Sequence, residues 1–207
     1  MNLLVVAATE LEIQPFLKEK NNADILITGV GIAATIFHLT KKLSGKKYDI
    51  VIQAGIAGTF NRRFHLGEVV AVKEDIFADL GIVENGKLNS LFDLGFIGKN
   101  DFPYTESWLV NNDSILKKIH LPVAKGITLN KIGDDPVQNT MMTSKFSPDV
   151  ESMEGAAFHY VCLQEKINFL QLRSISNYVG ERDKSKWELK AAIENLNKAL
   201  LDVIEKL

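Results

Sequence analysis

Short apolar runs, separated by segments of helical spacing, constrain the fold of this chain more than any other feature. The first run, residues 3–8, is entirely apolar, as is typical of a central strand covered on both faces. Further strand-like runs lie at residues 24–28, 48–53, 66–72, 123–129 and 169–175. Helical patterns extend to about Leu43, to about Gln164 and from Trp187 to the C-terminus. This alternation predicts an α/β protein, a three-layer α/β/α fold with a mixed central β-sheet.

Composition limits the size and the class of the protein. A chain of 207 residues fits one domain, so we expect a single domain over residues 1–207. The net charge of −2 offers no basic surface to nucleic acid, and no apolar run approaches the roughly 20 residues of a membrane span. The lone Cys162 excludes an internal disulfide and fits a reducing compartment. We therefore expect a cytoplasmic protein with no membrane or nucleic-acid partner.

Several predicted strands end in residues that can contact a ligand. Glu12 follows the first strand, glycine-rich turns are expected at residues 29–31 and 55–58, and Asn177 follows the last strong strand. Open α/β sheets bind their ligands beyond the carboxyl ends of the strands. The recurrence of such residues at successive strand ends indicates an enzyme.

The segment Gly29–Ala34 matches the G-x-G-x-x-A pattern of dinucleotide-binding proteins. This pattern leaves open an oxidoreductase that binds NAD, although no acidic residue ends a clear strand at the distance that ribose binding requires. The alternative is a tight strand-to-helix turn that lets backbone amides approach a different ligand.

The segment Val150–Phe158 carries two carboxylates, Glu151 and Glu154, followed by Gly-Ala-Ala. We expect Glu154 in the first turn of a largely buried helix, where the helix dipole favours a carboxylate. One interpretation is a capping pair on a surface helix. The other is a ligand site, because small residues on the next turn permit close approach.

Residues 84–113 show no strong periodicity and contain several aromatic residues between Phe92 and Trp108. Such residues commonly fix a loop to the body of a protein, and the alternatives are a substrate lid or a contact between subunits. His38, His120 and His159 show no ligand spacing, so we expect no metal site.

Four motifs together resemble the nucleoside phosphorylase and nucleosidase superfamily: Ala8–Glu12, Gly55–Gly58, Val150–Ala156 and Arg173–Asn177. The resemblance extends over essentially the whole chain and implies a nucleoside phosphorylase-like fold, a small nucleoside as substrate, no cofactor and a homo-oligomer. Within the superfamily the similarity is greatest to the enzymes that hydrolyse futalosine in menaquinone biosynthesis. The methylthioadenosine/adenosylhomocysteine nucleosidases are the next most similar group.

The resemblance also implies roles for individual residues. Glu12 matches the carboxylate that activates the attacking water, Met153 and Glu154 match the ribose-binding pair, and Asn177 matches the contact to the leaving purine. The chemistry agrees, since a carboxylate can orient water and can bind two ribose hydroxyls with its two oxygens. The substrate pocket is further expected to contain Gly31, Gly55 and Ile56.

Two departures from the superfamily pattern bear on the reaction. The adenine-specific relatives have Asp in place of Asn177, and an Asn side chain cannot protonate N7 but presents an NH₂ donor to N7 or to a 6-oxo group. Asn177 therefore favours hypoxanthine over adenine as the leaving base. The related phosphorylases have Arg and Ser where this chain has Gln53 and Ile56, which form a poor phosphate site. Water is therefore the expected nucleophile.

Other parts of the pocket stay open at this point. The segment Gly133–Val137 matches the purine-lining region of the relatives but carries Pro136 where they often have an aromatic residue. The benzoate-bearing tail of futalosine calls for a cation, and the candidates are Arg62, Arg63, His65 and Arg182. The alternatives to futalosine hydrolysis are an adenine-releasing nucleosidase, a phosphorylase, the NAD-binding oxidoreductase and a nucleoside-binding protein without turnover.

Overall fold

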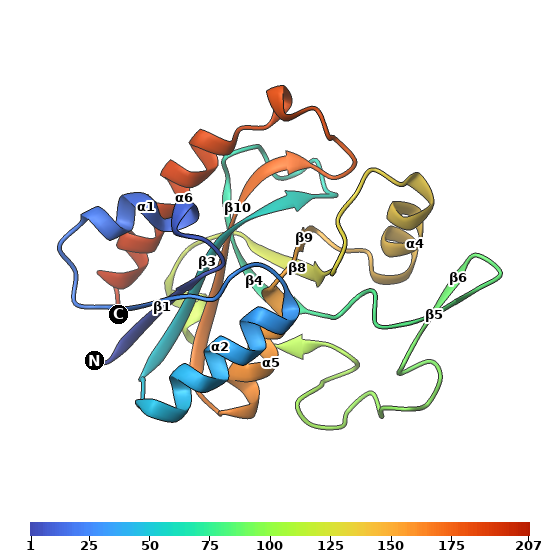
Figure 1. Ribbon diagram of the computed structural model, residues 1–207, viewed down its shortest axis with the longest axis horizontal. Helices are drawn as coiled ribbons and strands as arrows, with labels where there is room; N and C mark the ends of the chain where they lie inside the picture. The colour runs from blue at the N-terminus through green and yellow to red at the C-terminus, as the bar shows by residue number, and fades with distance from the viewer.

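The computed structural model describes all residues from 1 to 207 and has helices on both faces of a mixed β-sheet (Figure 1). The strand order is β10-β4-β8-β9-β3-β1-β2, and β10 also pairs with β3, so that five strands close into a barrel from which β1 and β2 extend. The pairs β10–β4, β3–β9 and β4–β7 are antiparallel, and the others in this sheet are parallel. The predicted three-layer fold with a mixed central sheet is confirmed.

The bounds of the elements follow the predicted alternation. The strands are β1 (Leu3–Ala7), β2 (Asp24–Ile27), β3 (Ile50–Thr59), β4 (Val69–Asp75), β5 (Gly81–Glu84), β6 (Lys87–Ser90), β7 (Leu109–Val110), β8 (Val123–Thr128), β9 (Val150–Ser152) and β10 (Asn168–Tyr178). The helices are α1 (Glu10–Lys18), α2 (Ile32–Gly45), α3 (Ile115–Lys118), α4 (Pro136–Phe146), α5 (Gly155–Gln164) and α6 (Leu189–Ile204), with a 3₁₀ turn at Lys184–Lys186. No helix has both the length and the apolar character that crossing a bilayer requires.

The strand β1 is buried on both faces, as its uninterrupted apolar sequence predicts. Leu3 and Val5 belong to a cluster that α1, α3 and α6 complete, whereas Leu4 and Val6 belong to a second cluster with α2 and α5. Alternate residues of a strand point to opposite faces of the sheet, so a strand in the middle layer needs apolar residues at every position.

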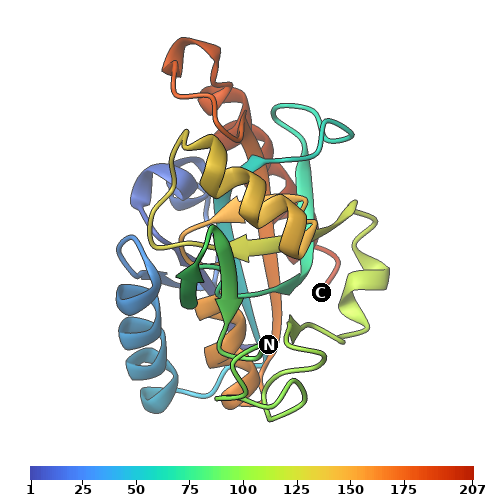
Figure 2. The same ribbon diagram turned by 90° about the vertical axis from the view of Figure 1, so that its right-hand side faces the viewer.

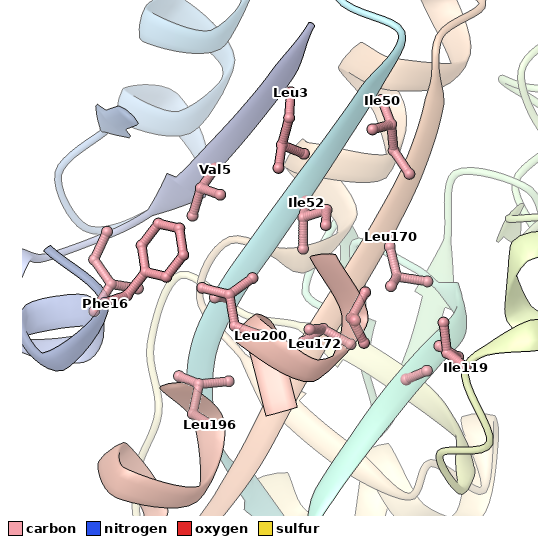
Figure 3. Packing of buried hydrophobic residues seen from close by; sticks show 14 of the residues in the cluster. Leu3, Val5, Phe16, Ile50, Ile52, Ile119, Leu170, Leu172, Leu196 and Leu200 are labelled. Atoms are coloured by element: carbon pink, nitrogen blue, oxygen red, sulfur yellow. The ribbon is translucent and has the colours of Figure 1, made fainter. Parts of the chain in front are cut away.

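The first of these clusters fixes α1 and α6 to the sheet. Figure 3 shows Phe16 of α1 and Leu196 and Leu200 of α6 packed against Val5 and Ile52 of the strands. Each fully buried side chain of this size stabilises the fold by about 1.5–3 kcal/mol. Because α1 follows β1 directly, this packing also determines where the first turn of α1 lies.

The helix α4 was not predicted, because only a turn was expected around Pro136. The Asp135 carboxylate accepts a hydrogen bond from the Val137 amide at 2.9 Å, and Pro136 occupies the first turn, where it loses no helical hydrogen bond. The helix buries only Met142 and Phe146, so it has a weak apolar periodicity. It lies at the right of Figure 1 and on the side that faces the viewer in Figure 2.

Residues 84–113 contain part of the β5–β6 hairpin and β7 rather than wholly irregular chain. Phe92 stacks edge-on against Tyr104 with 5.0 Å between ring centroids, and Trp108 stacks against Phe146 of α4 at 6.0 Å. These aromatic residues thus fix the segment to the body of the protein, which is one of the alternatives expected from the sequence. Phe96 remains 73% exposed, so it takes no part in this packing.

Candidate active site

A cavity of about 630 Å³ opens where several strands of the barrel end. Its lining residues come from the ends of β1, β3, β9 and β10, from the start of α1 and α6, and from the loops after β8 and β10. The residues expected from the sequence that line it are Glu12, Ile56, Met153, Glu154 and Asn177. The structure therefore brings together side chains that are as far apart as 165 positions in the sequence numbering.

Three protein donors hold the carboxylate of Glu12. Its Oε2 accepts hydrogen bonds from the amide and the hydroxyl of Thr9, both at 3.0 Å, and its Oε1 accepts one from the Ile56 amide at 3.1 Å. A carboxylate has about four acceptor positions, so the group keeps capacity for a water molecule in the cavity. The donors fix its orientation before any substrate binds.

A buried side-chain amide holds the backbone of the helical turn that carries Glu12. The helix α1 has non-helical torsion angles at Ile13 and contains Pro15, which interrupts the regular hydrogen bonding. Asn197 of α6 accepts a hydrogen bond from the Phe16 amide at 2.9 Å and donates one to the Glu12 carbonyl at 2.8 Å. These two backbone groups would otherwise bond to each other, so Asn197 bridges the break and locks the first turn.

Gly55 lies within β3 rather than in a turn, so the predicted turn at residues 55–58 is wrong. The strand continues to Thr59, paired with β10 along its length. A Cβ atom at position 55 would lie 2.3 Å from Nη1 of Arg173 and 3.0 Å from Oε1 of Glu12. The glycine is thus required by the close approach of two charged side chains, and not by the backbone direction.

Glu154 immediately precedes α5, one residue before its predicted position in the first turn. Its Oε1 accepts a hydrogen bond from the Gly31 amide at 3.0 Å, and its Oε2 lies 3.7 Å from Nη1 of Arg173. Burial raises the pKa of this carboxyl group, while Arg173 and the Gly31 amide act in the opposite direction. Gly31 and Gly55 therefore lie behind the cavity wall, each in contact with one of its carboxylates.

The segment Gly29–Ala34 forms the tight turn that leads into α2. Gly29 and Gly31 have φ angles of 81° and 97°, which other residues rarely adopt. The amide of Gly31 donates to Glu154, so this turn approaches a carboxylate of the protein itself.

Arg173 is a buried residue beside the cavity to which sequence reasoning assigned no role. Its side chain is 1% exposed, contacts Glu154 and lies beside Gly55. It also donates from Nη2 to Gln53 Oε1 at 3.0 Å and from Nη1 to the Ile56 carbonyl at 3.4 Å. The available signal was a cation in the middle of an apolar strand, because a buried charge needs fixed partners.

A polar network beneath α5 fixes the position of Glu154. The buried carboxyl group of Asp75 accepts hydrogen bonds from Thr128 Oγ1 at 2.9 Å and from Gln171 Nε2 at 3.3 Å. Thr128 Oγ1 in turn accepts one from the Ala156 amide in the first turn of α5 at 2.7 Å. Burial raises the pKa of Asp75 to about 6, against the effect of these donors and of Arg173.

The far end of the cavity is formed by neighbouring strands around Gly58. Asn177 of β10 pairs with Gly58 on one side, and Glu151 of β9 pairs with it on the other. A Cβ atom at position 58 would lie 3.3 Å from both Asn177 Nδ2 and Glu151 Oε1. The missing side chain leaves room for both polar groups to face the same space.

Hydrogen bonds determine the orientation of the Asn177 amide. Nδ2 donates to the Tyr178 carbonyl at 3.1 Å, and the Ser176 hydroxyl, whose one hydrogen is shared between Oδ1 at 2.8 Å and the Ala57 carbonyl at 3.2 Å, lies on the other side. A carbonyl oxygen can only accept, so the atom beside Tyr178 is the nitrogen. The NH₂ group has a second hydrogen and retains one donor for a ligand.

The residues considered as cations for the benzoate-bearing tail lie in different places in the structure. Arg182 lines the cavity, whereas Arg62 lies over the ring of Tyr178 at 4.5 Å and Arg63 pairs with Asp149 at 3.0 Å. Sequence reasoning did not single out Lys131 and Lys184, which also line the cavity. Residues 130–132 form part of the wall, while the segment 133–137 leads into α4.

Comparison with known sequences identifies relatives over most of the chain. A sequence model of the phosphorylase superfamily matches residues 5–207. The futalosine hydrolase of Thermus thermophilus is 30% identical over 183 residues, which cover 84% of this chain and 78% of that protein. A 5′-methylthioadenosine/S-adenosylhomocysteine nucleosidase of a Geobacillus species is 25% identical over 198 residues, covering 90% of this chain and 83% of that protein.

Solved structures share the fold over the full chain. The futalosine hydrolase of Helicobacter pylori superposes with a TM-score of 0.83 at 14% identity and covers 100% of this chain and 98% of that chain. A 5′-methylthioadenosine/S-adenosylhomocysteine nucleosidase of Colwellia psychrerythraea, in complex with adenine, gives a TM-score of 0.82 at 18% identity and covers 100% and 96%. The architecture is thus that of the nucleoside phosphorylase-like folds.

Proposed function

We propose that this chain, which belongs to the phosphorylase superfamily and is an N-glycosyl hydrolase, hydrolyses futalosine to hypoxanthine and dehypoxanthine futalosine. The observation that carries the choice of base is the fixed amide of Asn177. The Tyr178 carbonyl holds its NH₂ group beside Gly58, and this group keeps one free donor for the base. Hypoxanthine presents acceptors at N7 and O6, whereas the 6-amino group of adenine is itself a donor.

The remaining groups fit the departure of the base from the sugar. Glu12 orients a water molecule toward C1′ and takes its proton as the water attacks. Glu154 accepts hydrogen bonds from ribose hydroxyls, and Met153 lines the adjacent wall. Both carboxylates also stabilise the positive charge that builds on the sugar as the N-glycosidic bond breaks.

The environment of Arg173 favours water over phosphate as the nucleophile. The guanidinium group contacts Glu154, the Gln53 side chain and the Ile56 carbonyl, all of which are acceptors. The guanidinium group therefore already interacts with acceptors of the protein. The backbone and the alkyl side chain of Ile56 add no cation for a phosphate ion.

Measurement of the free base released in phosphate-free buffer tests the proposal. We expect hypoxanthine from futalosine and no comparable release of adenine from methylthioadenosine. Adenine release from methylthioadenosine alone would contradict the choice of substrate but not the nucleosidase chemistry. A reaction that begins only when phosphate is added would contradict the interpretation of Gln53 and Ile56.

A further inference from the structure

Glu151 is a buried residue whose carboxyl group has no role in the reaction proposed above. It is 2% exposed and lines the cavity from β9. Its carboxyl group has no hydrogen-bond partner in the protein, in contrast to Glu12 and Glu154, which accept bonds from backbone amides. A buried ionised carboxylate without donors is costly, so this environment favours the protonated acid.

The position of Glu151 relates it to the leaving base. Gly58 separates it from Asn177, and both polar ends lie within 3.3 Å of the point that a Gly58 Cβ would occupy. A 6-oxopurine carries two neighbouring acceptors on one edge, N7 and O6. Two donors from β9 and β10, the strands on either side of Gly58 in β3, match this pair of acceptors.

Loss of the purine requires a donor that Asn177 cannot provide. As the N-glycosidic bond breaks, its electron pair goes to the base, and protonation at N7 makes the base a better leaving group. The amide of Asn177 can donate a hydrogen bond but cannot transfer a proton. The site therefore lacks an acid unless another group provides one.

We propose that Glu151 is the general acid of this site and protonates N7 of the leaving 6-oxopurine, while Asn177 donates a hydrogen bond to its O6. This inference rests on the proposed function. The proton moves from the Glu151 carboxyl group to N7 as the electron pair of the C1′–N9 bond moves to the base. Water adds to C1′ and gives a proton to Glu12, and exchange with solvent returns both carboxyl groups to their starting states.

The electrostatic surroundings are consistent with this role near neutral pH. Burial raises the pKa of Glu151 to about 7, and Arg182 opposes the rise. The acid is therefore partly protonated at neutral pH, where a general acid is most effective. The other charged residues that line the cavity are Glu12, Glu154, Lys131, Arg182 and Lys184.

The experiment compares two substrates in the wild-type protein and in Glu151→Gln. Futalosine needs a proton at N7, whereas N7-methylated futalosine already carries a positive imidazole ring and needs none. We expect Glu151→Gln to lower kcat/KM for futalosine by about 10²–10⁴, the usual contribution of a general acid. For the methylated substrate we expect a loss of less than about tenfold. Glu205→Gln, an exposed substitution beyond α6, is the matched control for both substrates.

The pH profile provides a second readout on the wild-type protein. With futalosine, kcat/KM should fall as the pH rises through about 7, because the acid form of Glu151 is lost. With the methylated substrate this fall should disappear.

Each other outcome has a distinct meaning. If Glu151→Gln lowered kcat/KM equally for both substrates, the acid role would be overturned. It would also be overturned if this variant hydrolysed futalosine at the wild-type rate. Absence of futalosine turnover by the wild-type protein would overturn the proposed function, and this inference with it.

Discussion

Burial of Glu151 predicts that replacing it will change how the stability of the protein depends on pH. Its pKa rises from the ordinary value of 4.5 to about 7 on folding because the carboxyl group leaves water. A folded state that holds the proton more tightly than the unfolded state loses stability as the pH rises. This contribution is fully present below about pH 4.5 and is lost as the pH passes through about 7.

The magnitude follows from the two pKa values. A rise of about 2.5 in pKa, at 1.36 kcal/mol for each pH unit, corresponds to about 3 kcal/mol. Glu151→Gln removes the titration, so the difference in unfolding free energy between variant and wild type should shift toward the variant by about 3 kcal/mol from pH 4 to pH 8. Asp75 and Glu154 also have raised pKa values, but they are present in both proteins and cancel in the difference.

Urea unfolding at a series of pH values measures this difference, with circular dichroism as the probe. The change with pH is the quantity to compare, because any fixed cost of placing an amide in the cavity is the same at every pH. A difference that stays constant between pH 4 and pH 8 would refute the reasoning, since it would mean that Glu151 titrates as it does in water. Glu205→Gln should show no such pH dependence, because that residue is exposed.

Three further predictions follow from the site. Glu12→Gln should lower kcat by at least about 10²-fold, the low end for general base catalysis, with the folded circular dichroism spectrum retained; near-wild-type turnover would remove Glu12 from the mechanism. Gly55→Ala should destabilise the protein by about 1–3 kcal/mol, because its Cβ would lie 2.3 Å from Arg173 Nη1, whereas Gly45→Ala, where nothing lies within 4 Å, should be neutral or slightly stabilising in the same urea titration. Asn177→Asp should shift the ratio of kcat/KM values from 6-oxopurine toward 6-aminopurine nucleosides, and an unchanged ratio would argue against reading of the base by this side chain.

Local sequence pattern was sufficient for the main layer of the fold. The apolar run of β1 is covered on both faces, as its composition predicts, and Glu12 lies in the first turn of the helix that follows it. Glu154 and Asn177 likewise line the cavity expected at the ends of the strands. These predictions depend on residues close in sequence and on the rule that the carboxyl ends of parallel strands share an edge.

Local pattern was misleading where small residues serve contacts between distant segments. Residues 55–58 resemble a turn, yet they continue β3 because their hydrogen-bond partners are supplied by β10. The helix α4 was missed because most of its residues face solvent, so its start signals, Asp135 and Pro136, had no apolar periodicity to support them.

The sequence by itself determined the α/β class, the buried central strand and the motifs that contain the carboxylates Glu12 and Glu154. Each of these follows from patterns within one segment. Only the tertiary structure decided that Arg173 pairs with Glu154 beside Gly55, and that Glu151 and Asn177 lie on opposite sides of Gly58. These relations depend on strand register and on which side chains share a face of the barrel. Pairing between segments sets the register, so no single stretch of the chain contains the information.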